Sequence, residues 1–426
     1  MRLARTPNLA TIFAVALLTP ASNLAAAAPR LLLDIPTPPE VPAWLGSCAV
    51  WCLLLALGLV LYTYAGYPLL CLLLARLRPR PLAKDALWPP AQLPMLTVVI
   101  AAYREAGTIT DKLATLAAQD YPAERVSVVL CCDGSDDGTP EVAEAAGRRL
   151  MPGRLQVLRL LRGGKPAALN AGAAVASGEI LVMTDARQRM NPGALQALAH
   201  ALSDPQVGIV SGELVLGGDA GAGAYWRYEA WIRRNEGRSG SVIGVSGALY
   251  AMPRRLWRPL PPETILDDLL TPLWVRQRGL RVAFEPGAQA FDQAAAHGRE
   301  FLRKARTLSG NYQLLLLAPE LLLPWRNPSW LGFVSHKLLR LLVPFALVVL
   351  LLATLLALGA GAEPAGPLWA FLLAQLGGYG LALLHLWPPA RRSALVRLAS
   401  TFVVLNAAAV VGLWRVLRTG RNQRWT

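Results

Sequence analysis

Apolar residues form long uninterrupted runs near both ends of the chain and short runs between them. Residues 41–75 carry no charged side chain, and this length is ample for one transmembrane helix. Pro68 lies inside the run, and because proline lacks a backbone N–H it is expected to kink or end the helix. The pattern therefore predicts a first transmembrane helix at residues 41–75.

The C-terminal region, residues 330–417, shows the same pattern and is expected to form interfacial and transmembrane helices. Two uncharged segments, at about 341–362 and 366–388, are each long enough to span a bilayer. A third, at 398–414, is short and bounded by arginines, so it either spans with those arginines snorkelling or lies in the interface. If it spans, the arginine-rich tail lies outside, against the positive-inside rule.

Residues 1–30 have the pattern of a secretory signal. Arg2 and Arg5 precede a short apolar stretch around residues 11–18, and small residues follow at 25–28. The same pattern fits an uncleaved first membrane segment, so the sequence leaves both interpretations open.

Between residues 93 and 320 the apolar runs shorten and alternate with helical patterns. The expected strands are 96–101, 126–132, 155–161, 179–184, 208–216, 246–252 and 281–285. The expected helices are 107–119, 140–150, 165–176, 191–202, 225–238, 266–278 and 299–317. This alternation predicts an α/β fold with a mostly parallel sheet and helices on both faces.

The composition fits one α/β domain joined to membrane helices. The 426 residues are 54% apolar and 16% charged, which is too apolar for a purely soluble chain and too charged for a pure membrane bundle. The net charge of +15 first suggests a nucleic-acid binder. The basic residues, however, cluster beside the apolar spans, at Arg76, Arg78, Arg80, Lys84, Arg391, Arg392, Arg397, Arg415, Arg418, Arg421 and Arg424. That placement favours cytoplasmic flanks and contact with anionic membrane lipid, and no nucleic-acid partner is expected.

Other cofactor classes find no support. Cys48, Cys52 and Cys71 lie in an apolar span, and Cys131 and Cys132 are adjacent in a predicted strand, so none has disulfide or metal-ligand spacing. The four histidines have no partner at ligand spacing, and the chain lacks a Gly-x-Gly-x-x-Gly or P-loop motif. Dehydrogenase and ATPase functions are therefore not indicated, and a reducing compartment is expected.

An acidic turn follows the predicted strand at 126–132. It contains Asp133, Asp136 and Asp137 among glycines, at the strand end where ligands bind in open α/β sheets. Carboxylates there accept hydrogen bonds from a base or ribose, or hold a cation beside phosphates. The alternative is a solvated turn before a helix that begins at Thr139.

Six segments in order resemble the family 2 membrane glycosyltransferases of the GT-A fold, the relatives of cellulose, hyaluronan and poly-β-1,6-N-acetylglucosamine synthases. The segments are Ala101–Glu105, the turn at 132–139, Lys165–Asn170, Thr184–Arg187, Gly244–Ala251 and Ile265–Asp268. The resemblance is close over residues 93–317 and implies a Rossmann-like GT-A nucleotide-sugar domain at 93–320, flanked by transmembrane helices.

By this resemblance, one group of residues binds the nucleotide-sugar. The group comprises Ala102, Tyr103, Glu105, Asp133, Asp137, Lys165, Asp185 and Arg187. Asp133 matches the acid that contacts uracil, and Cys132 stands where many relatives have a further Asp. Lys165 matches a basic residue near the phosphates, although an ordinary helix-start lysine would look the same.

Asp185 matches the first acid of the family's DxD motif, which places a divalent metal, Mg²⁺ or Mn²⁺, on the diphosphate. Arg187 stands at the second acid, so the metal site is expected to be weakened. Either Asp185 still binds the metal with diphosphate and water, or Arg187 itself offsets the diphosphate charge. Retained metal dependence is the expectation.

Asp268 matches the general base for the acceptor hydroxyl, with Asp267 beside it. Two acids at a helix N-terminus also suit the helix dipole without any catalytic role. Gly247 matches a small-residue loop near the acceptor, and Arg303 and Arg306 match positions that face the acceptor or diphosphate.

Thr307 replaces the tryptophan that stacks the acceptor in processive relatives, which places processive polymerisation in doubt.

The resemblance implies an inverting glycosyltransferase in a bacterial inner membrane, multi-pass, with its catalytic domain in the cytoplasm. It is expected to move a sugar from a nucleotide-sugar, UDP-hexose or UDP-N-acetylhexosamine, to a growing polysaccharide or lipid-linked acceptor. Two alternatives remain: a non-processive transferase that makes one lipid-linked sugar, and a catalytically silent membrane scaffold that retains the fold.

Overall fold

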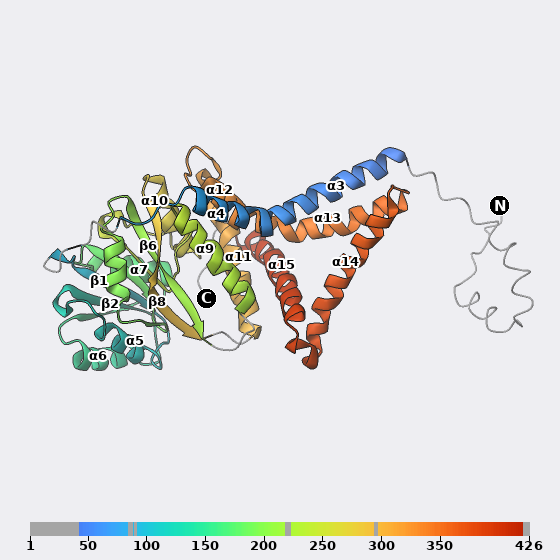
Figure 1. The fold of residues 1–426 in the computed structure, drawn as a ribbon. Helices are drawn as coiled ribbons and strands as arrows, with labels where there is room; N and C mark the ends of the chain where they lie inside the picture. Colours follow the sequence, from blue (N-terminus) through green and yellow to red (C-terminus); the bar gives the residue numbers. More distant parts are fainter. Residues whose placement is uncertain (1–41, 84–87, 89–91, 218–222, 294–296, 421–426) are drawn as a thin grey trace, which may run out of the picture.

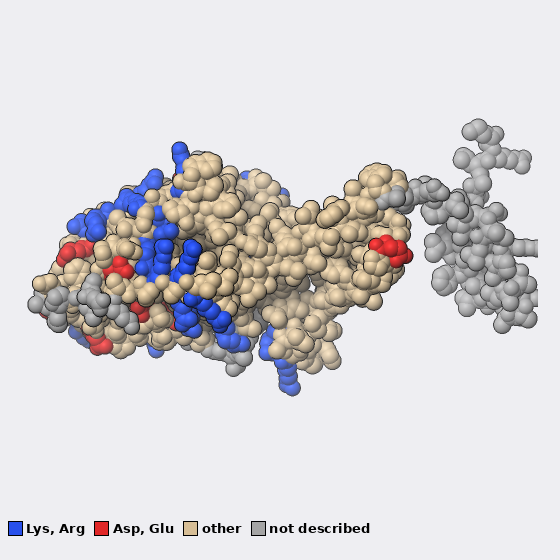
Figure 2. Space-filling model, turned by 45° about the horizontal axis from the view of Figure 1, so that its top comes forward, with Lys and Arg blue, Asp and Glu red and all other residues tan. Residues whose placement is uncertain are grey.

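The computed structural model describes residues 42–83, 88, 92–217, 223–293 and 297–420. The signal-like segment predicted at residues 1–30 lies outside the described residues. A globular α/β part joins a long helical arm (Figure 1). In Figure 2 most charged side chains lie on the globular part, whereas the visible face of the arm carries few of them.

A single sheet of eight strands organises the globular part, in the order β3-β2-β1-β4-β7-β6-β8-β5. The strands are β1 Leu96–Ala102, β2 Val126–Asp133, β3 Leu155–Leu160, β4 Ile180–Asp185, β5 Arg189–Met190, β6 Val207–Gly217, β7 Leu249–Pro253 and β8 Arg281–Gln293. Strands β3, β2, β1 and β4 are mutually parallel, as are β6 and β8, whereas β7 and β5 run antiparallel to their neighbours. The predicted α/β class with a mostly parallel sheet is confirmed.

Helices cover both faces of this sheet. They are α5 Ile109–Ala117, α6 Thr139–Leu150, α7 Lys165–Val175, α8 Ala194–Ala201, α9 Gly223–Ser239 and α10 Asp267–Gln277. The next helix, α11 His297–Leu317, packs mainly against residues 394–419 of the arm, and its C-terminal end reaches the core. Along β1, Val98 and Ile100 pack with α5, α6 and α8, while Val99 packs with α7 and α10 on the other face. Alternate residues of a strand face opposite sides, so an unbroken apolar strand supplies both cores.

Two strands differ from their predicted limits. The strand predicted at 246–252 begins only at Leu249, because Gly247 approaches Asp268 at the start of α10 and the Ser246 N–H donates to Ser211 Oγ at 2.9 Å. The strand predicted at 281–285 continues to Gln293, although Pro286 and Gly287 indicate a turn. A register shift against β6 between Ser211 and Glu213 accommodates these residues and lets pairing resume.

Four helical segments are long and apolar enough to cross a membrane: Trp44–Leu77, Trp330–Gly359, Ala365–Leu386 and Ala394–Thr419. They contain α3 Ala43–Leu61, α4 Tyr67–Leu77, α12 Trp330–Gly332, α13 Leu339–Gly359, α14 Ala365–Leu383 and α15 Ala394–Thr419. α15 is much longer than the segment predicted at 398–414, and its length suits a spanning helix. In Figure 1, α3 and α13 run side by side, and Leu53 of α3 packs with Leu350 of α13.

Pro68 does not end the first helix, contrary to one of the two predicted outcomes. A π-helical turn, Tyr62–Gly66, precedes it, and α4 then continues to Leu77 with Pro68 in its first turn. The helix is continuous through this turn, so Pro68 lacks the N–H that would bond the Tyr64 carbonyl, and the Tyr228 hydroxyl donates to that carbonyl instead at 2.8 Å. A second π-helical turn, Phe333–Leu338, precedes α13.

Candidate active site

Polar side chains converge where β1, β2 and β4 end at their carboxyl edge. Lys165, the first residue of α7, points its Nζ atom at Asp185 at the end of β4, 3.0 Å from Oδ1. The same Nζ lies 3.5 Å from Oδ2 of Asp267 at the start of α10. Burial opposes the charge of Lys165, but the carboxylates of Asp185, Asp267 and Asp268 outweigh it and raise its pKa. One ammonium group therefore joins residues from three distant parts of the chain.

The two acids at the start of α10 have different environments. The Asp267 side chain is 3% exposed beneath Lys165, whereas Asp268 is only partly buried. Burial raises the pKa of Asp267, with Lys165 acting in the opposite direction. Burial and then the charge of Asp267 raise the pKa of Asp268 to about 6. Asp268 is thus accessible and poised to accept a proton near neutral pH.

Gly247 lies between the ammonium and the accessible carboxylate. A Cβ atom at Gly247 would be 3.4 Å from Nζ of Lys165 and 3.4 Å from Oδ2 of Asp268. The absence of a side chain keeps the space between the two charged groups open. The backbone nearby is also tied to α10, because the Val245 N–H donates to the Asp268 carbonyl at 2.8 Å.

Asp133 holds the loop that leads into α7. Its carboxylate accepts the backbone N–H groups of Gly163, at 2.6 Å, and Gly164, at 3.0 Å, and pairs with Arg162 at 2.8 Å. The Arg162 guanidinium lies 3.4 Å from the centre of the Tyr103 ring. Asp133 therefore places the start of α7, while its contact with uracil stays a prediction.

The loop after β1 is joined to the acidic turn after β2. The Glu105 N–H donates to Thr139 Oγ1 at 2.9 Å, and the Ala106 N–H donates to Asp137 Oδ2 at 3.1 Å. Arg104, with φ +56°, adopts a backbone conformation that non-glycine residues seldom occupy, and its side chain pairs with Asp136. Ala102, Tyr103, Glu105, Asp133 and Asp137 thus belong to one connected edge of the sheet.

Arg187 turns toward Asp292 near the end of β8. Its guanidinium lies 2.9 Å from Asp292 Oδ2, and Gln188 donates to the same oxygen at 3.0 Å. Asp185 keeps a side chain that is 36% exposed beside Lys165. The described residues contain no group of three or more His, Cys, Asp or Glu side chains able to hold a metal. Any metal here would therefore take most of its ligands from substrate and water.

Helix α11 carries the basic residues predicted to face the acceptor or diphosphate. Burial lowers the pKa of Arg306, while the charges of Asp185 and Asp268 act in the other direction, so this guanidinium lies within electrostatic reach of the acidic cluster. Arg303 adds a like charge nearby. Gly310 lets α11 approach the loop before α10, since a Cβ atom there would be 2.5 Å from Cγ of Leu266.

Cys132, at the position where many relatives have Asp, is buried in the core of the sheet. Thr307 is exposed, and its hydroxyl donates a hydrogen bond to the Arg303 carbonyl.

Three residues of the site were not found from the sequence. Lys112 of α5 is buried and donates to Thr184 Oγ1 at 2.6 Å, and burial lowers its pKa to about 7. The buried Tyr250 hydroxyl has no hydrogen-bond partner among the described residues, and burial, then the charges of Asp267 and Asp268, raise its pKa. Asp292 forms an ion pair with Arg187. The sequence around each of these residues is that of an ordinary strand or helix. Only Lys112, a charged residue on the apolar face of a predicted helix, could have indicated a site residue.

Known glycosyltransferases are similar to this chain in sequence and in fold. A solved mannosyltransferase from Pyrobaculum calidifontis, in complex with GDP-Man and Mn²⁺, is 26% identical with a TM-score of 0.64, covering 85% of this chain and 99% of its own. An N-acetylglucosaminyltransferase of Rhizobium meliloti is 28% identical over 43% of this chain and 43% of its own length. Glycosyltransferase AglE of Haloferax volcanii is 29% identical over 38% of this chain and 53% of its own.

The chain thus spans about half or less of the curated relatives that it matches. The sequence model described as "Glycosyltransferase like family 2" matches residues 94–308, the segment that carries the strand ends, the acidic cluster and the basic helix α11. This chain therefore belongs to glycosyltransferase family 2 and has the GT-A fold.

Proposed function

We propose that this chain is an inverting membrane glycosyltransferase that moves a hexose or N-acetylhexosamine from a UDP-linked donor to a growing polysaccharide or a lipid-linked acceptor. The observation that carries the proposal is the convergence of Lys165, Asp185, Asp267 and Asp268 at the strand ends. A sugar transferase needs a cation for the leaving diphosphate and a base for the acceptor hydroxyl, and this cluster offers both.

In the proposed step, the Asp268 carboxylate takes the proton of the acceptor hydroxyl. The hydroxyl oxygen bonds to the anomeric carbon on the face opposite the diphosphate, and the bond from that carbon to the diphosphate oxygen breaks. Its electron pair leaves with the nucleoside diphosphate, so a single displacement inverts the anomeric centre. Lys165 and Arg306 are assigned to the diphosphate charge, and Gly247 leaves room for the reacting sugar.

Donor recognition is assigned to the connected edge formed by Ala102, Tyr103, Glu105, Asp133 and Asp137. This edge lies at the carboxyl ends of parallel strands, where open α/β sheets bind nucleotides. Arg187 is also assigned to donor binding, because it lies in the same loop after β4 as Asp185. Arg303 is assigned to the acceptor or diphosphate because it lies on α11 beside Arg306.

A divalent cation, Mg²⁺ or Mn²⁺, fits Asp185 if the donor supplies further oxygens. Mg²⁺ commonly uses one or two protein carboxylates together with substrate phosphates, and Asp185 offers one accessible carboxylate. When bound, the ion would neutralise charge on the leaving diphosphate. The solved mannosyltransferase relative was determined with Mn²⁺.

Excess chelator is expected to lower transfer by about a hundredfold or more, because the described protein residues supply few ligands and cannot compete for the ion. The measurement is initial rate against added Mn²⁺ or Mg²⁺ after chelation, with Zn²⁺-free buffer throughout. Full rate in excess chelator would show that Lys165, Arg187 and Arg306 carry the diphosphate charge without metal.

The protein is assigned to a bacterial inner membrane as a multi-pass protein with the α/β part in the cytoplasm. Four helices are long and apolar enough to span. Arg76 lies in the last turn of the first of them and Arg78 directly follows it, and positive flanks stay on the cytoplasmic side.

A panel of radiolabelled UDP-sugars, offered to the purified full chain in nanodiscs, tests the function. Label in a glycan or lipid product is expected, and the size of that product separates a polymer from a single added sugar. The exposed Thr307, in place of a stacking aromatic, favours the non-processive alternative. Absence of both transfer and nucleotide binding would favour the silent scaffold.

A further inference from the structure

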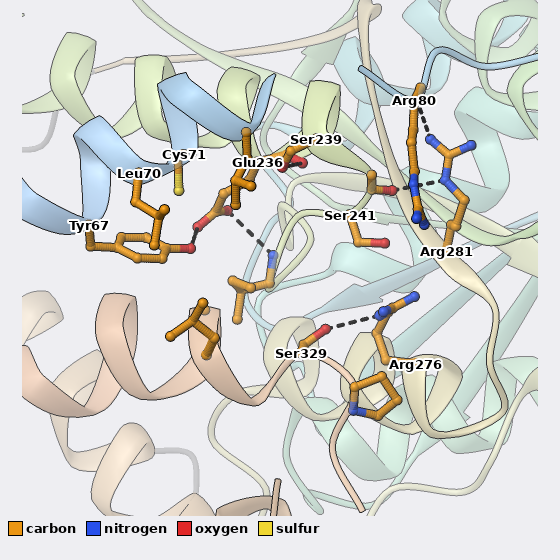
Figure 3. Close-up of a pocket in the computed structure, with 16 residues that line it drawn as sticks. Tyr67, Leu70, Cys71, Arg80, Glu236, Ser239, Ser241, Arg276, Arg281 and Ser329 are labelled. Carbon is orange, nitrogen blue, oxygen red and sulfur yellow. Dashed lines mark hydrogen bonds between the residues drawn. The ribbon is translucent and has the colours of Figure 1, made fainter. Parts of the chain in front are cut away.

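A second cavity lies away from the acidic cluster, where the globular part meets the helical arm. It encloses about 210 Å³ between α4, the end of α9, the start of β8 and the segment that leads into α12. Figure 3 shows Tyr67, Leu70 and Cys71 on one side, with Arg80, Arg276 and Arg281 on the opposite side. The cavity is therefore mostly apolar at one end, where Glu236 lies beside Tyr67, and cationic at the other.

The cationic end brings three guanidinium groups together. Arg281 is 7% exposed and donates to the carbonyls of Gly240, at 2.9 Å, and Arg80. Arg276 donates to Ser329 Oγ and to the Leu280 carbonyl, both at 2.9 Å. Burial and then the charges of Arg281 and Arg80 lower the pKa of Arg276. The three positive charges therefore repel one another.

Protein carboxylates offset this charge only in part. Among the described residues, Asp204 is the one carboxylate recorded within 4.0 Å of these guanidinium groups, 3.6 Å from Arg281 Nη1. Glu236 lines the cavity but accepts the Tyr67 hydroxyl at 2.8 Å and lies 2.7 Å from His336 Nδ1. An anion beside Arg80 and Arg276 would relieve the repulsion.

The position of the cavity indicates the kind of anion. Its walls include the last turns of the apolar segment Trp44–Leu77 and the first turn of Trp330–Gly359. The cavity therefore lies at the ends of these two segments that adjoin the globular part. Leu331 lines the cavity and is 48% exposed. Leu73 and Leu77, in the same turns of α4 as the lining residues Leu70 and Leu74, are 51% and 69% exposed, and these three exposed leucines form the leucine rim. Figure 2 shows basic side chains gathered in a band on the globular part. An exposed leucine rim beside arginines suits a molecule with acyl chains and a phosphate.

We propose that this cavity binds the phosphate headgroup of an anionic phospholipid, with its acyl chains lying outside along the leucine rim. The cavity volume of about 210 Å³ has room for a phosphate headgroup. Arg80 and Arg276 contact the phosphate, and Arg281 holds the backbone that shapes the cavity. The lipid would tie α4 of the arm to β8 and α10 of the catalytic part.

The test uses the full chain in detergent, titrated with phosphatidylglycerol or phosphatidylcholine and followed by native mass spectrometry. Wild type is expected to retain one phosphatidylglycerol in preference to phosphatidylcholine. Arg80→Gln and Arg276→Gln should each weaken that retention about tenfold, as expected for losing one charge-assisted contact to phosphate. Arg78→Gln is the matched control, because Arg78 is exposed on the same basic flank but does not line the cavity.

Three results would overturn the proposal: no preference for the anionic lipid, equal weakening by Arg78→Gln, or displacement of the lipid by millimolar inorganic phosphate. The last would assign the cavity to a soluble anion. Arg80→Gln keeps the test decisive if Arg276→Gln fails to fold, because the Arg80 side chain is exposed and its bonds to Arg238 and Arg281 use backbone atoms.

Discussion

Replacement of Asp268 by Asn is expected to lower sugar transfer by about a thousandfold while donor binding stays within twofold of wild type, since a general base contributes roughly 10²–10⁴ in rate. Asparagine matches the carboxylate in size but cannot take the acceptor proton. Asp268 is partly accessible and lies across from Lys165 over Gly247, whereas Asp267 is buried. Single-turnover transfer and equilibrium binding of the nucleotide donor measure the two quantities separately.

The pH dependence gives the same assignment a second readout. Burial and the charge of Asp267 raise the pKa of Asp268 to about 6, so its basic form is lost as the pH falls through that value. The rate in wild type is expected to decline below about pH 6, and the residual rate of Asp268→Asn should lack this decline. Asp111→Asn, which alters an exposed carboxylate on α5 that pairs with Arg189, is the control. A fully active Asp268→Asn enzyme would move the base to another residue.

Replacement of Lys165 by Met is expected to impair both stability and transfer. Methionine keeps much of the apolar stem but leaves Asp185, Asp267 and Asp268 without their shared cation. Removing one partner of a buried pair costs roughly 3–5 kcal/mol, so the free energy of unfolding should fall by about 3 kcal/mol. Transfer should fall by about a hundredfold or more, because the leaving diphosphate loses a positive charge.

A double variant separates the two effects. Lys165→Met with Asp267→Asn removes the buried cation and the buried acid together, so most of the lost stability should return while transfer stays low. Burial already raises the pKa of Asp267 in the folded wild type, and Lys165→Met removes the charge that opposes this, so the folded pKa should rise further. Such an acid favours the folded state below its unfolded pKa, and that advantage is lost as the pH rises through the folded pKa. The single variant should therefore gain stability on acidification from pH 7 toward pH 4.

Denaturant unfolding at both pH values measures these changes. If Lys165→Met were as stable and as active as wild type, Lys165 would be an ordinary residue at a helix start, the alternative that the sequence left open.

Much of the architecture followed from local pattern. Strand β2 was predicted within one residue, because a short valine-rich run ends at an acidic turn. The predicted end of β8 was wrong, because Pro286 and Gly287 by themselves indicate a turn. Hydrogen bonding to β6 and β5 continues the strand beyond them. The length of α15 was underestimated because the arginines that bound its uncharged segment set the predicted limits. The helix continues past both, and α11 packs against it at Gly412.

The sequence by itself determined the α/β class, the membrane-type helices and the order of the motifs, because these depend on periodicity and charge within short segments. Only the tertiary structure decided that Lys165 serves Asp185 and Asp267 together, that Arg187 turns to Asp292, and that arginines 80, 276 and 281 share one cavity. Those contacts join residues from separate elements. Their choice of partner depends on how the sheet and helices pack, and no local pattern records it.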